Sequence, residues 1–339
     1  ILTELSGLSQ EVKHETTVEV FERSIEHFDA WSKGDEGKID RSREIVWGIP
    51  VLDEKLGGWN PVMSDFLVLL GGDSSWGKSS LARQVAVNNC YRGKRVANFL
   101  LETSTFSWPA QAAAQRAQVN LRQDPLELAA VAKGEEKLEK FRAEMRRYRE
   151  WAAEERLFVD ETAVTAEQVA ARSRMIAART GSLDLIVVDY LQEMRSPDRK
   201  LRGDQALHEN CRELKALGKE LRCPVLLLSS INTDYPKDYG PGKWDYRGSR
   251  DITYAADQAF QIFRPEKDAN GVEQTELTAS GEPRKSFQQL VNRVKGRDAG
   301  TGAAWVTFQP RFTLWWGLPP SGKRGRKSHD PEYAGAQEF

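Results

Sequence analysis

The segment from Gly72 to Ser79 constrains the fold of this chain more than any other part of the sequence. It reads Gly-Asp-Ser-Ser-Trp-Gly-Lys-Ser and so has the spacing G-x-x-x-x-G-K-[S/T]. An apolar run, Phe66 to Leu70, precedes it, and a helical pattern from Ser80 to Tyr91 follows it. In a strand–loop–helix of this kind, loop N–H groups and the helix N-terminus converge on phosphate oxygens. The segment therefore predicts a nucleotide site.

The residues of this loop have separate expected roles. Gly72 and Gly77 let the backbone approach a ligand closely. Lys78 is expected to contact the β- and γ-phosphates, and the Ser79 hydroxyl is expected to bind Mg²⁺. We therefore expect ATP and Mg²⁺ as cofactors. The predicted binding segment is Gly72, Asp73, Ser74, Ser75, Trp76, Gly77, Lys78, Ser79 and Ser80.

Two carboxylates follow buried-type strands elsewhere in the chain. Asp189 comes directly after the aliphatic run Leu185 to Val188, and Glu102 ends the strand Arg95 to Leu101. If these strands are parallel to the one before the loop, both carboxylates emerge at its edge of the sheet. Asp189 is then expected to hold the metal, and Glu102 to orient the water that attacks the γ-phosphate.

Short aliphatic strands alternate with helical segments along most of the chain. This alternation predicts an α/β fold with a mostly parallel central sheet flanked by helices. One long helical region is expected from Gln111 to Glu155. Antiparallel edge strands are expected near the C-terminus. Their predicted ranges are Gln258–Phe263, Phe287–Val294, Ala304–Phe308 and Phe312–Trp316.

Composition narrows the class of protein further. Of the 339 residues, 40% are hydrophobic and 29% charged, and no apolar run approaches the roughly 20 residues that cross a bilayer. Three cysteines and four histidines are scattered without metal-ligand spacing, which predicts no disulfide framework, no zinc site and a cytoplasmic location. The net charge is −1, so any nucleic-acid contact must come from local basic patches.

Residues 1–45 are expected to be separate from the ATPase domain, 46–318, and from a basic tail, 319–339. Val18, Phe21, Ile25 and Phe28 recur at helical spacing, and a Gly- and charge-rich linker follows them. This apolar face either packs on its own domain or docks on a neighbouring subunit, and the sequence favours neither. The chain is expected to be either a fragment of a larger protein or a plasmid-, phage- or island-encoded variant with a different N-terminal part, and the start at Ile1 favours a fragment.

Several motifs in order resemble one family. The segment Gly48–Gly58 looks like the start of RecA-superfamily ATPase domains, and Val187–Gln192 is similar to the metal-binding strand of DnaB-type replicative helicases. The resemblance runs over roughly residues 46 to 316. Its further motifs are Leu214–Leu221, Cys223–Val225, Asp245–Asp257, Lys295–Arg297 and Thr301–Gly302.

The resemblance implies a RecA-like core in a ring hexamer that hydrolyses ATP and moves along single-stranded DNA during replication. It implies that Lys78, Ser79, Asp189 and Glu102 form one subunit's site. Lys295 and Arg297 match the basic finger that a neighbouring subunit inserts toward the γ-phosphate. Primase, polymerase or a loader are further partners implied by the resemblance, and no membrane is expected.

Two positions depart from the family pattern. Ser230 stands where the family usually has a Gln sensor, and Asp298-Ala299-Gly300 replaces the usual Gly-Pro step of the finger. Ser230 has a shorter side chain than glutamine, which puts in question whether the presence of the γ-phosphate is signalled to the DNA-binding loops. Two alternatives therefore stay open. One is an ATPase that assembles on DNA or protein without unwinding, and the other is a nucleotide-binding regulator or loader with little hydrolysis.

Basic loops supply the candidate DNA contacts. Such side chains follow the phosphate backbone without reading sequence, so their affinity falls with salt. A solvated charged loop is the other interpretation. The candidate residues are Arg195, Arg199, Lys200 and Arg202 after Asp189, with Arg247 and Arg250 further along.

Overall fold

The computed structural model describes residues 17–18, 21–22, 25–26, 29, 33, 43–59, 66–131, 133–196, 203–232, 246, 250–266, 287–296 and 301–317. The chain divides into two compact units, Ile1–Glu44 and Ile45–Phe339. In the first unit the described residues from 17 to 29 are helical, and Val18, Phe21 and Ile25 are exposed. The described residues do not include Phe28, most of the expected linker after it, or the expected basic tail, 319–339.

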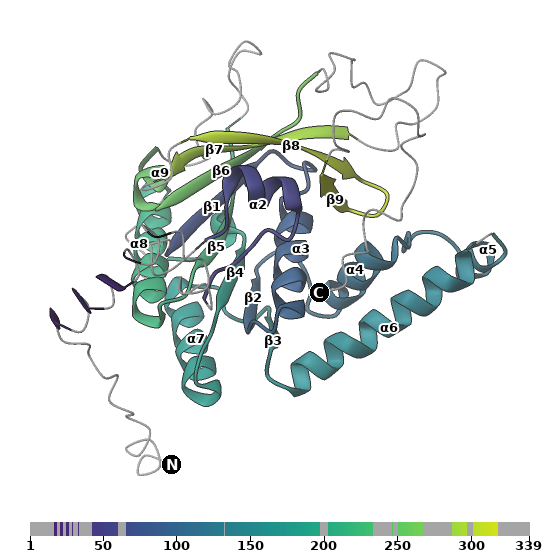
Figure 1. The fold of residues 1–339 in the computed structure, drawn as a ribbon, viewed down its shortest axis with the longest axis horizontal. Coiled ribbons are helices and arrows are strands. Elements are labelled where there is room, and N and C mark those ends of the chain that lie inside the picture. The colour runs from purple at the N-terminus through teal and green to yellow at the C-terminus, as the bar shows by residue number, and fades with distance from the viewer. Residues whose placement is uncertain are drawn as a thin grey trace. The chain divides into compact units, whose positions relative to one another are not determined.

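One nine-stranded sheet organises the second unit, in the order β3-β2-β4-β5-β1-β6-β7-β8-β9 (Figure 1). Neighbouring strands from β3 to β6 pair in parallel, and those from β6 to β9 pair antiparallel. The predicted fold class is therefore confirmed. The strands are β1 (Leu67–Gly72), β2 (Val96–Leu100), β3 (Leu157–Asp160), β4 (Leu185–Asp189), β5 (Val225–Ser230), β6 (Gln258–Phe263), β7 (Phe287–Gly296), β8 (Gly302–Gln309) and β9 (Leu314–Gly317).

Helices cover both faces of this sheet (Figure 1). Side chains alternate between the faces of a strand, and β1 shows this clearly. Its Val68 and Leu70 pack with α3, α4 and α6, whereas Leu67 and Leu69 pack with α7, α8 and α9. The helices are α2 (Pro50–Leu56), α3 (Lys78–Tyr91), α4 (Ser107–Ala117), α5 (Pro125–Ala129), α6 (Gly134–Ala153), α7 (Ala166–Thr180), a 3-10 turn (Leu191–Glu193), α8 (Asp204–Leu221) and α9 (Arg250–Ala255).

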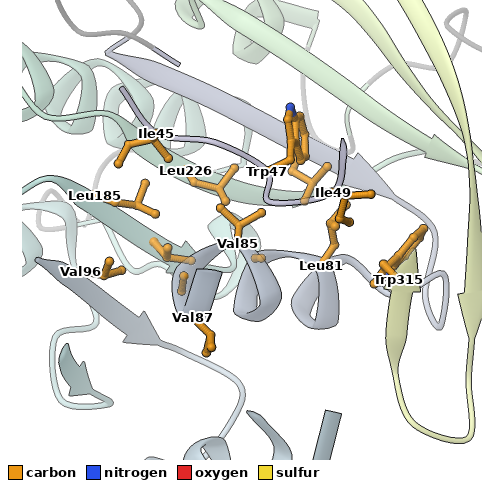
Figure 2. Packing of buried hydrophobic residues seen from close by; sticks show 14 of the residues in the cluster. Ile45, Trp47, Ile49, Leu81, Val85, Val87, Val96, Leu185, Leu226 and Trp315 are labelled. Carbon is orange, nitrogen blue, oxygen red and sulfur yellow. The ribbon is translucent and has the colours of Figure 1, made fainter. Parts of the chain in front are cut away.

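The hydrophobic core holds α3, the helix that follows the glycine loop, in place. Figure 2 shows Leu81 and Val85 of α3 among side chains of the central strands, with Trp47 from the segment before α2 nearby. Leu81, Val85 and Trp47 have no solvent exposure. The full burial of this interface gives the loop a rigid base, because close-packed interiors resist displacement.

The structure corrects the single helical region expected from Gln111 to Glu155. The first helix ends at Ala117, where Gln118 adopts a left-handed conformation with φ 54°. Asp124 then accepts a hydrogen bond from the N–H of Leu126 and caps α5, which begins at Pro125. Proline has no N–H to continue a preceding helix, so it begins a new one. The expected strand Phe312–Trp316 likewise begins only at Leu314, after a turn.

The strand register brings four chain positions to one edge of the sheet. Gly72 at the end of β1 lies opposite Ser230 at the end of β5. Leu100 at the end of β2 lies opposite Asp189, and the next N–H, of Leu101, donates to the Asp189 carbonyl at 2.7 Å. The carboxyl ends of parallel strands are the usual place for a ligand in such sheets.

Candidate active site

The glycine loop turns sharply between β1 and α3. Gly77 has φ 89°, a left-handed conformation that favours glycine, and a Cβ there would lie 2.8 Å from the ring of Trp315. The Lys78 ammonium donates to the carbonyl oxygens of Gly72 at 2.8 Å and Asp73 at 3.0 Å. These bonds hold Lys78 against the loop, where it can meet a phosphate chain.

A cavity of about 460 Å³ lies at this edge of the sheet. It joins the glycine loop to the ends of β2, β4 and β5 and to the turn between β8 and β9. Its lining residues are Ser74, Ser75, Gly77, Lys78, Ser79, Ser80, Arg83, Glu102, Thr103, Gln111, Asp189, Tyr190, Ser230, Phe308, Pro310 and Thr313. Of the expected loop residues, Gly72, Asp73 and Trp76 do not line the cavity. Instead, the Asp73 carboxylate accepts from the N–H of Ser74 at 2.7 Å, and Trp76 packs edge-on against Phe263.

The two expected carboxylates reach the cavity in different surroundings. Asp189 is only 6% exposed, whereas Glu102 is exposed. Burial raises the pKa of Asp189, and the neighbouring Glu102 raises it further, while Ser79, Arg83 and Lys78 lower it. A buried carboxylate and an exposed one in a single site suit two different tasks.

The donor set at this edge fits a divalent cation of the Mg²⁺ type. One oxygen of Asp189, Oδ1, is buried without a hydrogen-bond partner in the part of the chain that the structure describes. The Ser79 hydroxyl interacts with the same carboxylate. Mg²⁺ prefers such hard oxygen ligands and completes its shell with water and phosphate oxygens. Among the described residues no group of three or more His, Cys, Asp or Glu side chains offers an all-protein metal site.

Burial also acts on Lys78. It lowers the pKa of this ammonium, while Asp189, Asp73 and Glu102 raise it again. The cation is therefore stabilised by the carboxylates around it and partly desolvated by the protein. A partly desolvated cation interacts more strongly with an incoming anion than a solvated one does.

Several lining residues were not among the sequence-based candidates. Arg83 and Gln111 face the cavity from α3 and α4, and Phe308, Pro310 and Thr313 close it from the C-terminal strands. The latter three lie more than two hundred residues after the loop, and no local pattern marks them as site residues. An arginine between apolar residues of α3 was the one visible signal.

The segment 313–315 is fastened to α3, just after the glycine loop, both directly and through Gln115 of α4, which donates to the Thr313 carbonyl at 2.5 Å. The Trp315 indole N–H donates to the Ser80 hydroxyl at 2.9 Å, and the side chain of Gln115 donates to the Ser80 carbonyl at 3.0 Å. Gln84 both donates to the Trp315 carbonyl and accepts from its N–H. The wall made by β8 and β9 is thus part of the site, although it is distant in sequence.

The predicted sensor position is supported by Gln192, a glutamine of the 3-10 turn that follows β4. Ser230 lines the cavity, and its N–H donates to the side-chain oxygen of Gln192 at 3.1 Å. The Gln192 amide donates in turn to the hydroxyl of Ser229 at 2.8 Å. An amide side chain therefore does bind the end of β5, but it comes from the segment after Asp189. The sensor role of Ser230 stays a prediction.

Of the two predicted finger residues only Lys295 is described, and it is not among the residues that line the cavity. Lys295 near the end of β7 donates to the carbonyl oxygens of Thr253, Tyr254 and Ala256 at 2.7–3.0 Å. It therefore binds the C-terminal end of α9. Arg297 lies outside the described residues, and its expected contact with a neighbouring copy stays a prediction.

The DNA candidates are only partly described. Arg195 is exposed, and its N–H donates to the carbonyl of Val164 at 2.9 Å. Arg250 begins α9. Arg199, Lys200, Arg202 and Arg247 lie outside the described residues, so the DNA-binding role of this group stays a prediction.

The cysteines do not form a reactive site. Cys90, Cys211 and Cys223 are all buried and free, and burial raises the pKa of Cys90 and of Cys211 to about 12. Thiols of such high pKa are poor nucleophiles near neutral pH. In the described ranges no helix has the length and apolarity needed to cross a bilayer.

A strand, a Gly-Lys-Ser loop, a helix and an acidic neighbouring strand define a P-loop nucleotide-binding protein with a RecA-like sheet. Residues 45–316 match the family model described as the DnaB-like helicase C terminal domain. The chain belongs to this family, which confirms the resemblance seen in the sequence.

Individual relatives agree with this assignment. The replicative DNA helicase DnaB of Pasteurella multocida is 30% identical over 228 residues, 66% of this chain and 46% of that protein. That of Haemophilus influenzae is 29% identical over 258 residues, 74% of this chain and 52% of that protein. The chain thus spans about half the length of these relatives.

Solved structures show the same fold. A DnaB-like replicative helicase, solved in a study of its interactions with primase, gives a TM-score of 0.68 at 17% identity. That match covers 94% of this chain and 70% of the other. A second solved structure, described as an ATPase domain, superposes with a TM-score of 0.66 at 16% identity and covers 87% of this chain and 99% of that one.

Proposed function

We propose that this chain is the ATPase motor of a replicative DNA helicase, with residues 46–318 as the motor domain. It hydrolyses ATP at the subunit interfaces of a ring hexamer and moves along single-stranded DNA. The observation that carries this proposal is the convergence of Lys78, Ser79, Asp189 and Glu102 on one cavity, in a chain of the DnaB-like family.

In this proposal the chain's own groups bind and orient the nucleotide. The N–H groups of the glycine loop and the Lys78 ammonium hold the β- and γ-phosphates. Ser79 and Asp189 are the residues that hold Mg²⁺, which, when bound, neutralises charge on the phosphate oxygens. Lys78 is partly desolvated by the surrounding protein, which strengthens its attraction to the phosphates.

The chemical step is assigned to Glu102. Its carboxylate accepts a proton from a water molecule as the water oxygen bonds to the γ-phosphorus. The bond from the γ-phosphorus to the β–γ bridging oxygen breaks, leaving ADP and inorganic phosphate. Arg297 of a neighbouring copy is proposed to stabilise the charge that develops on the transferred group.

The proposed partners follow from the same relationship. Single-stranded DNA would occupy a central channel lined by the loops after Asp189 and before α9, where Arg195 and Arg250 lie. Family membership supports this assignment, and so does the basic character of the loops. A relative studied with primase supports primase as a further partner.

The test is ATP turnover by the full chain with and without single-stranded DNA. We expect turnover that rises with DNA, and loss of both binding and turnover in Lys78→Ala. Glu102→Gln should keep nucleotide binding and lower kcat by about 10²–10⁴-fold. The exposed Glu139→Gln on α6 is the matched control and should behave as the unaltered chain.

Other outcomes point to other functions. Turnover that DNA does not stimulate contradicts the motor and supports an ATPase that assembles without unwinding. Nucleotide binding without measurable turnover supports a regulator or loader. Normal turnover in Lys78→Ala contradicts the assignment of the site itself.

A further inference from the structure

Arg83 is a buried cation in the wall of the cavity, and the proposed reaction gives it no role. It lies on α3 just beyond the glycine loop, and only 6% of it is exposed. Arg83 is therefore almost wholly removed from water. A charge in such surroundings is costly unless a polar partner compensates it.

The partners of Arg83 within the described residues satisfy only part of the guanidinium. One terminal nitrogen donates to the side-chain oxygen of Gln111, which also lines the cavity from α4. The Nε atom is buried and has no hydrogen-bond partner among the described residues. No carboxylate oxygen described in the structure lies within 4.0 Å of its nitrogens.

Asp189 is a buried carboxylate that lines the same cavity as Arg83. The negative charge of the Asp189 carboxylate partly offsets the effect of burial on the pKa of Arg83. The Oδ1 atom of Asp189 is also buried without a partner in the described part of the chain. An unmatched buried donor and an unmatched buried acceptor of opposite charge therefore line the same cavity.

Burial makes the positive charge of Arg83 costly, which points to a functional reason for keeping an arginine at this position. It lowers the pKa of Arg83 to about 10, and Asp189 raises it again. Packing alone does not require a guanidinium here, because a methionine of similar length would fill the space without that cost. The charge is better explained by what it does to the site.

We propose that Arg83, fixed by Gln111, is a positioning residue that orients the Asp189 carboxylate toward Ser79 and the divalent cation. This inference rests on the proposed nucleotide site. The positive charge of the guanidinium attracts the carboxylate without a direct hydrogen bond, and so favours the orientation in which the carboxylate meets Ser79 and the cation. Second-layer groups that orient a metal ligand act in this way in other metal sites.

The test compares nucleotide binding in the absence of metal with nucleotide binding in the presence of Mg²⁺. The probe is a fluorescent ADP analogue, titrated onto the full chain in EDTA and then at rising Mg²⁺. In Arg83→Met we expect unchanged affinity in EDTA and a rise of about tenfold in the Mg²⁺ concentration for half-maximal binding. The ATPase kcat should fall more than KM changes. Arg83→Lys, which keeps the charge, should recover part of the Mg²⁺ affinity.

Arg116→Met is the matched control. Arg116 lies on α4, contacts Glu144 and the ring of Tyr91, and does not line the cavity. Its substitution should leave the Mg²⁺ requirement unchanged. A purely structural role for Arg83 would instead weaken probe binding equally in EDTA and Mg²⁺ and lower Tm. That result overturns the proposal, and so does an unchanged Mg²⁺ requirement in Arg83→Met.

A second variant keeps the test decisive if Arg83→Met fails to fold. Gln111→Met leaves the guanidinium in place but removes its anchor, so the Mg²⁺ requirement should rise in the same direction by a smaller factor. An unchanged requirement in a folded Gln111→Met overturns the anchoring role. If the unaltered chain binds the probe with Mg²⁺ but turns over no ATP, the motor proposal fails while the binding data still decide the role of Arg83.

Discussion

Residues of similar chemistry have different tasks in this site because their surroundings differ. Asp189 is buried beside Lys78 and Arg83, whereas Glu102 is exposed at the end of the neighbouring strand. The buried carboxylate faces the hydroxyl of Ser79 and suits a metal ligand. The exposed one is accessible to water and suits proton transfer. A substitution at either position is expected to change function more than folding.

A residue outside the cavity makes stability depend on pH. Burial raises the pKa of Asp53 to about 6, although backbone N–H groups of Trp47, Gly48 and Ile49 and the charge of Arg92 lower it. The folded pKa exceeds the unfolded value of 3.8, so the folded state holds the proton more tightly and stability falls as pH rises from about 4 to 6.

Asp53→Asn removes this titration. The free energy of unfolding of the variant, relative to the unaltered chain, should therefore rise by about 2 kcal/mol between pH 4 and pH 7, after allowance for the partial exposure of the group. Urea unfolding at the two pH values measures this difference. The exposed Glu54→Gln is the control and should show a flat difference. A flat difference for Asp53→Asn as well would contradict the assigned pKa.

At the scale of elements, α9 is held mainly at its C-terminal end. Lys295 of β7 binds two carbonyl oxygens in the last turn of α9 and that of Ala256, the next residue. Lys215 of α8 binds the Ala255 carbonyl at 2.9 Å and the buried Asp257 at 2.7 Å. Cations at a helix C-terminus interact favourably with the carbonyl dipoles. These contacts tie α9 to the strand that leads toward Arg297.

Lys295→Met should loosen α9 without unfolding the sheet. Loss of one such cation costs about 1 kcal/mol, so hydrogen exchange in α9 should accelerate by about fivefold while exchange in α7 stays unchanged. Mass spectrometry of peptides covering residues 250–256 measures this. Lys219→Met, at an exposed position of α8, is the control. If exchange in α9 is the same in both variants, Lys295 does not stabilise that helix.

The parts of this structure that sequence could predict are those with a local signature. A local signature marks the strand–loop–helix from Phe66 to Tyr91. It also marks the strands followed or ended by Glu102 and Asp189, because parallel strands bring their carboxyl ends to one edge of the sheet. The break between α4 and α6 depends on the cap and proline at 124–125, and its signal was weaker than the surrounding helical composition. The wall formed by Phe308 and Thr313 depends on how distant strands pack, which no local pattern carries.

At the scale of the whole molecule, the site of one chain is half of the proposed active site. The cavity holds the groups proposed to bind phosphate, metal and water, and the cation proposed to complete it is Arg297 of another copy. A closed ring of identical subunits supplies this residue at every interface. A lone chain should therefore hydrolyse ATP poorly.

Mixing two inactive variants tests this claim most directly. Lys78→Ala removes a residue that acts within its own site, and Arg297→Ala removes one that acts on a neighbour. In an equal random mixture about one interface in four contains both intact residues, so DNA-stimulated ATP turnover should reappear at roughly a quarter of the unaltered rate. Turnover no higher than the average of the separate variants would contradict a site shared between subunits.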